Sequence, residues 1–117
     1  RKRTLALDDF AGKTMAVDAR TGTTVGSLWP ADRSPVFIPT SSLDEWLTLI
    51  ADGDVYGVTS EATAAQHPRP GIVYRPVRDA PAIEVRLAWW RGAKPALADA
   101  LARLIGAAYD EAPQLTR

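Results

Sequence analysis

Short apolar runs alternate with helical patterns along this chain, and this order limits the fold more than any other feature of the sequence. Three such runs are Thr14–Asp18, Val36–Pro39 and Val55–Thr59, and each has the length of a β-strand. Helical patterns follow the second and third runs. Strands separated by helices pair in parallel, because the chain crosses the sheet before it adds the next strand. The sequence therefore predicts an α/β fold with a largely parallel sheet flanked by helices.

The helices that follow these runs carry N-terminal capping signals. Ser42 and Glu45 have the spacing of a capping box, which predicts a helix over 42–51. Its apolar residues recur with a helical period, at Leu43, Trp46, Leu47 and Ile50. Gly53 is suited to end this helix, because glycine adopts the left-handed conformation that closes many helices. Ser60 predicts the start of a shorter helix that extends to Gln66.

A further group of patterns occupies the C-terminal part of the chain. The run Ile72–Val77 indicates a strand, and its Pro76 restricts that strand to a sheet edge or a strand end. Ile83–Trp90 alternates apolar and polar side chains, which predicts a half-buried strand. Pro95 is well placed in the first turn of a helix that extends to about Tyr109. The apolar stripe of this helix consists of Leu97, Leu101, Leu104, Ile105 and Ala108.

Charge and composition disfavour several classes of protein. Fourteen Lys and Arg balance fourteen Asp and Glu over 117 residues, so there is no basic excess to neutralise nucleic-acid phosphates. Arg1–Arg3 is a basic cluster, for which a solvated tail is the simpler interpretation. The chain has no cysteine, and no apolar run approaches the roughly 20 residues of a membrane-spanning helix. We expect a cytoplasmic protein without a membrane partner.

Residues for catalysis or metal binding are scarce. The single histidine, His67, precedes Pro68 in a turn. No acidic or nucleophilic residue has a sequence spacing from His67 that would indicate a catalytic site. An ordinary turn residue is therefore favoured over a general base. The acidic pairs lie in predicted first helical turns or around Gly53, where carboxylates are common for structural reasons. We expect no enzyme activity, no metal site and no cofactor.

Hydroxyl side chains gather where three predicted strands end. They form three junctions, which are Thr21, Gly22 and Thr23; Thr40 and Ser41; and Thr59 and Ser60. In an open α/β sheet, ligands bind beyond the carboxyl ends of the strands, where helix N-termini offer free N–H groups. The junctions are therefore predicted to lie on one edge of the sheet and to bind a small anion, and Arg20, Thr21 and Thr23 favour a metabolite that carries a carboxylate. Helix capping is the alternative for each hydroxyl taken singly.

The order of these segments resembles that of one known family. GIVYRPVRDAP (71–81) and VRLAWW (85–90), followed by a helix, are similar to the C-terminal end of LysR-type transcriptional regulators. LALDDFAGKTMAVD (5–18) looks like that family's segment before a strand. SSLDEWLTLIADGDVYGVTSEA (41–62) is similar to its segment of helix, glycine and strand. The resemblance covers nearly the whole chain in the right order.

This resemblance implies a two-lobed effector-binding domain, like that of the periplasmic binding proteins, with the small-molecule effector between the lobes. Residues 4–70 would form the second lobe, 71–79 the strand that crosses back, and 82–109 a return strand and helix of the first lobe. The chain would lack most of the first lobe and the N-terminal helix-turn-helix that contacts DNA. The resemblance also implies a homo-oligomer whose binding to promoter DNA changes when the effector binds.

Two other functions are compatible with the same architecture. One is a fragment of a periplasmic-type solute-binding protein, although the basic N-terminus lacks the apolar segment of a secretion signal. The other is an enzyme on a two-lobed scaffold, which the single histidine and the absence of cysteine disfavour. The sequence upstream of this chain would separate the first two functions, since a regulator carries a helix-turn-helix there and a secreted protein carries a secretion signal.

Overall fold

The computed structural model describes residues 3–20 and 24–111. The chain divides into two compact units, Arg1–Ala82 (unit 1) and Ile83–Arg117 (unit 2). The assignment of these parts to two lobes of a binding domain stays a prediction. Within the described residues, no helix has the length and the apolar character needed to cross a membrane.

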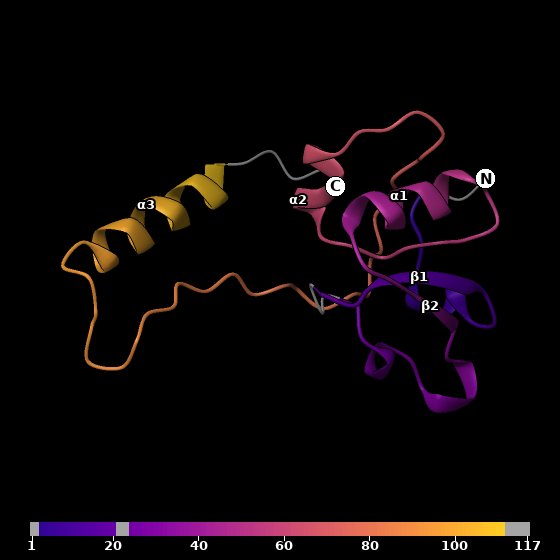
Figure 1. Cartoon of the computed structure of the whole chain (residues 1–117), viewed down its shortest axis with the longest axis horizontal. Helices are drawn as coiled ribbons and strands as arrows, with labels where there is room; N and C mark the ends of the chain where they lie inside the picture. Colours follow the sequence, from indigo (N-terminus) through magenta and orange to yellow (C-terminus); the bar gives the residue numbers. More distant parts are fainter. Residues whose placement is uncertain (1–2, 21–23, 112–117) are drawn as a thin grey trace. The chain divides into compact units, whose positions relative to one another are not determined.

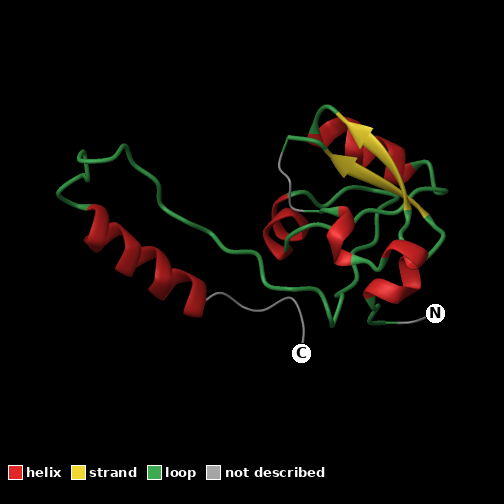
Figure 2. Ribbon diagram, turned by 90° about the horizontal axis from the view of Figure 1, so that it is seen from below, coloured by secondary structure: helices red, strands yellow, loops and turns green. Residues whose placement is uncertain are grey.

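Unit 1 is built on a two-stranded parallel sheet. Strand β1 (Thr14–Asp18) pairs with strand β2 (Val36–Thr40), with Thr14 opposite Val36 and Asp18 opposite Thr40. The two arrows in Figure 2 lie side by side and point the same way. Both strands begin and end within one residue of their predicted bounds. The predicted α/β class and parallel pairing are confirmed at the level of this small sheet.

β1 is the inner strand and β2 is an exposed edge. Met15 of β1 is fully buried, whereas Val36 of β2 is 62% exposed. The prediction that Val36–Pro39 forms a buried strand is therefore wrong about its burial. Pro39 has no N–H to offer a further strand, so this edge is poorly suited to extend the sheet.

The segment Val55–Thr59 is not a strand, so this prediction from the sequence is wrong. It makes a single parallel bridge, in which the N–H of Tyr56 donates to Thr14 O at 3.0 Å and the N–H of Ala16 donates to Tyr56 O at 2.8 Å. The next residue is Gly57, which has no side chain to pack and weakens a strand. The segment therefore touches the inner strand without extending the sheet.

Two further predicted strands are also wrong. Ile72–Val77 contributes only the parallel bridge between Val77 and Leu5. Its Pro76 lacks the N–H that would continue the ladder, although the Pro76 carbonyl accepts from the Leu5 N–H at 2.8 Å. Ile83–Trp90 has the alternating pattern of a strand, but within the described part of unit 2 no second strand is present to pair with it.

The helices of unit 1 begin where their capping signals predict. Helix α1 (Leu43–Ala51) follows Ser42, whose Oγ accepts from the N–H of Glu45 at 3.2 Å. Helix α2 (Glu61–Gln66) follows Ser60, which caps it in the same way. The described residues of the unit also form the 3-10 helices η1 (Leu7–Phe10), η2 (Gly26–Leu28) and η3 (Ala31–Arg33).

Two buried clusters cover β1, because neighbouring residues of a strand point to opposite faces. One contains Ala16, Trp46 and Leu47, and the other contains Phe10, Met15 and Trp29. Trp46 packs α1 against the sheet, and its Nε1–H donates to Ala16 O at 2.9 Å. Trp29 donates in the same manner to Leu7 O at 2.6 Å. Figure 1 shows α1 beside the two strands.

Unit 2 contains helix α3 (Ala98–Glu111), so the predicted helix is confirmed with a start three residues after Pro95. Before the helix, the Nζ atom of Lys94 lies 5.5 Å from the ring centre of Trp89 and 2.8 Å from Oδ1 of Asp99. The segment 83–90 is exposed throughout. Unit 2 thus presents much of its apolar surface to solvent.

Candidate functional site

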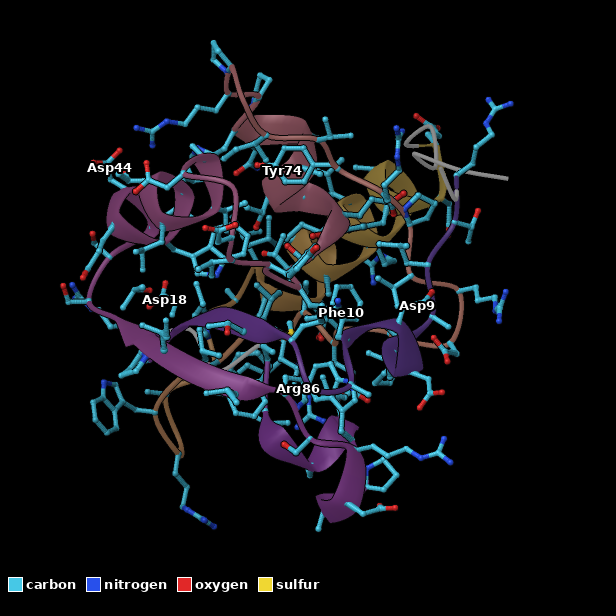
Figure 3. All side chains as sticks on the ribbon, turned by 90° about the vertical axis from the view of Figure 1, so that its right-hand side faces the viewer. Asp9, Phe10, Asp18, Asp44, Tyr74 and Arg86 are labelled. Carbon is cyan, nitrogen blue, oxygen red and sulfur yellow. The ribbon has the colours of Figure 1, made fainter. Side chains whose placement is uncertain are left out.

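A shallow hollow of about 520 Å³, widely open to solvent, lies in unit 1 where the strands end and α1 begins. Parallel pairing creates this arrangement, because it places Asp18 opposite the last residue of β2. Figure 3 labels Asp18 near the strand ends and Asp44 near the start of α1, on the same side of the unit. The lining residues are Ala19, Arg20, Pro39, Thr40, Ser41 and Glu45.

Thr40 lines the hollow and joins the ends of the two strands by hydrogen bonds. Its side chain is almost fully buried, and its Oγ1 donates to Val17 O at 3.2 Å. Its carbonyl accepts from the Ala19 N–H at 3.2 Å. The N–H of Arg20 in turn donates to Oδ1 of Asp18 at 2.9 Å. The Thr40 hydroxyl therefore has a structural partner within the sheet.

Ser41 and Glu45 line the hollow at the start of α1. Oε2 of Glu45 accepts from the Ser41 N–H at 2.8 Å and from Ser41 Oγ at 2.7 Å. These two hydrogen bonds, the side-chain one first, lower the pKa of Glu45, because they stabilise the carboxylate. The predicted capping box is thus half right, since Ser42 caps the Glu45 N–H but the Glu45 carboxylate bonds to Ser41 instead.

The third hydroxyl junction does not line this hollow. Thr59 Oγ1 donates to Oγ1 of Thr63 at 3.0 Å, and Ser60 Oγ accepts from the Thr63 N–H at 3.3 Å. Ser60 therefore caps α2, and the Thr59 hydroxyl is bonded to a side chain of the same helix. The first junction, Thr21, Gly22 and Thr23, lies outside the described residues. A common binding edge for all three junctions stays a prediction.

Arg20 supplies the positive charge of the hollow. Its side chain is exposed, and it stands with Ser41 around an opening that already contains one carboxylate, that of Glu45. The sequence indicates Arg20 as a residue that favours carboxylates but assigns Glu45 to capping alone. The sequence does contain a sign of the contact between Ser41 and Glu45. Two consecutive serines, Ser41 and Ser42, precede α1, so either hydroxyl could bond to the Glu45 carboxylate. Across the described ranges, no cluster of three His, Asp or Glu is arranged to hold a metal ion.

Comparisons of the chain with protein-family models, with curated proteins and with solved structures find no match.

Proposed function

We propose that this chain is part of the small-molecule effector-binding domain of a LysR-type transcriptional regulator. The hollow at the carboxyl ends of β1 and β2 is the observation that carries this proposal. Ligands of open α/β sheets bind at this position, beyond the ends of parallel strands and against a helix N-terminus. The assignment to a transcriptional regulator is based on the resemblance of the sequence to that family.

A small carboxylate is the effector that this site favours. The guanidinium of Arg20 can pair with a carboxylate through charge-assisted hydrogen bonds, which are stronger than neutral ones. The N–H and Oγ of Ser41 are further donors at the start of α1, where the helix dipole favours negative charge. A ligand carboxylate would have to compete with Glu45 for these two donors. Effector binding would therefore release the Glu45 side chain from Ser41.

In this proposal the chain itself neither catalyses a reaction nor contacts DNA. Its charge is balanced, whereas DNA binding relies on neutralising phosphates with a basic surface. Promoter binding would belong to a helix-turn-helix elsewhere in the full-length regulator, which would act in the cytoplasm as a homo-oligomer. A sequence-selective, salt-sensitive shift of promoter DNA by this chain alone would contradict this division of roles.

The effector site can be tested with matched pairs of small molecules. We would titrate the chain with acetate, succinate and benzoate, and with their neutral amides, and follow backbone amide signals by NMR. Carboxylates are expected to shift the signals of Ser41 and Glu45, and the amides are expected to bind more weakly. Arg20→Ala should weaken carboxylate binding about tenfold or more, because a hydrogen bond to a charged group contributes about 1.5–3 kcal/mol.

Arg91→Ala is the control, since Arg91 is an exposed arginine of unit 2 that does not line the hollow. Equal affinities of the Arg20→Ala and Arg91→Ala variants would reject the hollow as the carboxylate site. The coding sequence upstream of Arg1 tests the family part separately. A helix-turn-helix there supports the regulator, and a secretion signal favours a solute-binding protein instead.

A further inference from the structure

Two side chains of opposite charge line the hollow at the ends of β1 and β2. The cation is the guanidinium of Arg20 and the anion is the carboxylate of Glu45. Within the described residues, these two groups do not form an ion pair with each other or with any other side chain. Both side chains are exposed. The hollow therefore offers a ligand two separate charges of opposite sign, and neither has to leave an internal ion pair.

The other carboxylates near the hollow already have partners. Asp18 and Asp44, both labelled in Figure 3, lie close to the strand ends and to the start of α1. Oδ1 of Asp18 accepts from the Arg20 N–H at 2.9 Å, and Oδ1 of Asp44 pairs with Nη1 of Arg69 at 3.0 Å. Of the acidic residues that the structure describes, Glu45 is the one that lines the hollow. The formal charges of the lining, one positive and one negative, therefore balance.

A ligand that carries only a carboxylate matches half of this lining. Its charge is favourable beside Arg20, but it displaces the Glu45 carboxylate from the N–H and the hydroxyl of Ser41. The displaced carboxylate then has lost two hydrogen bonds and stands beside a ligand of the same charge, which opposes binding. An ammonium group on the ligand removes both disadvantages. It donates charge-assisted hydrogen bonds to the displaced carboxylate, and it makes the net charge of the ligand zero.

We propose that the effector is zwitterionic, a small carboxylate that also carries an ammonium group. This inference rests on the proposed function, since it uses the same carboxylate position beside Arg20 and Ser41. The ammonium group pairs with the Glu45 carboxylate once that group has left Ser41. Glu45 is thus the residue that selects amino-carboxylates over plain carboxylates, and its hydrogen bonds to Ser41 keep it at the hollow while no ligand is bound.

A matched set of three-carbon acids tests the ammonium preference. Alanine and β-alanine carry a carboxylate and an ammonium group at two different separations. Lactate has a neutral hydroxyl in place of the ammonium group of alanine, and propionate has the carboxylate alone. Each compound is titrated into the whole chain at neutral pH, and the backbone amide signals of Ser41 and Glu45 are followed by NMR. At least one of the two amino acids is expected to bind about two- to fivefold more tightly than lactate and propionate, because ion pairs exposed to solvent are weak.

Two variants assign the preference to one side chain. Glu45→Gln keeps the length of the side chain but removes its charge, so the ratio of amino-acid affinity to lactate affinity should fall to about one. Asp44→Asn is the matched control, because it removes the neighbouring carboxylate outside the hollow and should keep the ratio of the natural chain. The ratio within one variant is independent of its folded fraction, so a loss of stability does not imitate the expected result.

The outcomes separate this inference from the proposed function. If the natural chain binds lactate as tightly as both amino acids, or if the preference survives Glu45→Gln, the zwitterionic effector is rejected while the carboxylate site stands. If none of the four acids shifts the signals of Ser41 and Glu45, both the inference and the carboxylate site are rejected.

Discussion

The indole ring of Trp46 lies so close to Gly57 that a Cβ atom at Gly57 would stand 2.7 Å from Cε2 of the ring. Ile50, one helical turn further along α1, would lie 2.6 Å from the same Cβ atom. The helix can therefore approach the segment after Tyr56 only because position 57 lacks a side chain. The same indole donates its N–H to Ala16 O, so one side chain joins α1, β1 and the segment after Tyr56.

We predict that Gly57→Ala destabilises unit 1. The added methyl group would overlap both Trp46 and Ile50, and overpacking of this kind typically costs about 1–3 kcal/mol. Urea unfolding followed by circular dichroism would measure the loss. Gly26→Ala is the control, because a Cβ at Gly26 would meet Phe37 at an ordinary contact distance of 3.7 Å. An equal effect of the two substitutions would show that the close contact at Gly57 is not tight in solution.

The hydrogen bond of Trp46 gives a second prediction. Trp46→Phe keeps an aromatic ring in the core but removes the Nε1–H that donates to Ala16 O at 2.9 Å. The buried carbonyl then loses this partner, so we expect a loss of about 1–3 kcal/mol in the free energy of unfolding. Trp90→Phe should have almost no effect, since Trp90 is 87% exposed. Thermal unfolding of both variants would test this difference.

The helices can be predicted well from the sequence because helix signals are local. Ser42 and Ser60 each cap the helix that follows them, and Gly53 has the positive φ of 104° that its position after α1 requires. Each capping residue lies only a few positions along the chain from the backbone groups that it caps. The bounds of α1 and α2 can therefore be read from the chain without knowledge of the fold.

Strands are predicted less well because a strand also needs a partner. Ile83–Trp90 has the correct alternation, but the described residues of unit 2 provide no strand edge for it. Val36–Pro39 forms its strand, yet its burial depends on which face other elements cover. The candidate site depends on tertiary structure in the same way. Arg20 and Ser41 become neighbours of one hollow only through the parallel register of β1 and β2.

A third prediction concerns glycine in unit 2. Gly106 lies inside α3, and a Cβ atom added there would meet no other heavy atom within 4 Å, so Gly106→Ala should stabilise the helix by about 0.5–1 kcal/mol. Gly92→Ala should act in the opposite direction, because Gly92 has a φ of 77° that alanine adopts only with strain. Circular dichroism at increasing temperature would measure the helix content of both variants.

The last prediction concerns the pH dependence that Glu45 gives to α1. The two hydrogen bonds from Ser41 lower the pKa of Glu45 in the folded chain relative to the unfolded chain. A group with a lowered folded pKa stabilises the fold above its unfolded pKa, and this contribution is lost as the pH falls through the folded pKa. We therefore expect thermal stability to fall on acidification, and Glu45→Gln to remove part of that fall by eliminating the titrating group.

Ser41→Ala provides a graded control for this prediction. It removes the hydroxyl that donates to Glu45 at 2.7 Å but keeps the backbone N–H that donates at 2.8 Å. The pKa of Glu45 should then lie between its value in the natural chain and that in the unfolded chain, so the acid-dependent loss of stability should be smaller than in the natural chain. Melting temperatures of the three proteins, measured from neutral to acidic pH, would test this order. If Glu45→Gln and the natural chain lose stability in parallel on acidification, the contact between Glu45 and Ser41 does not contribute to the pH dependence.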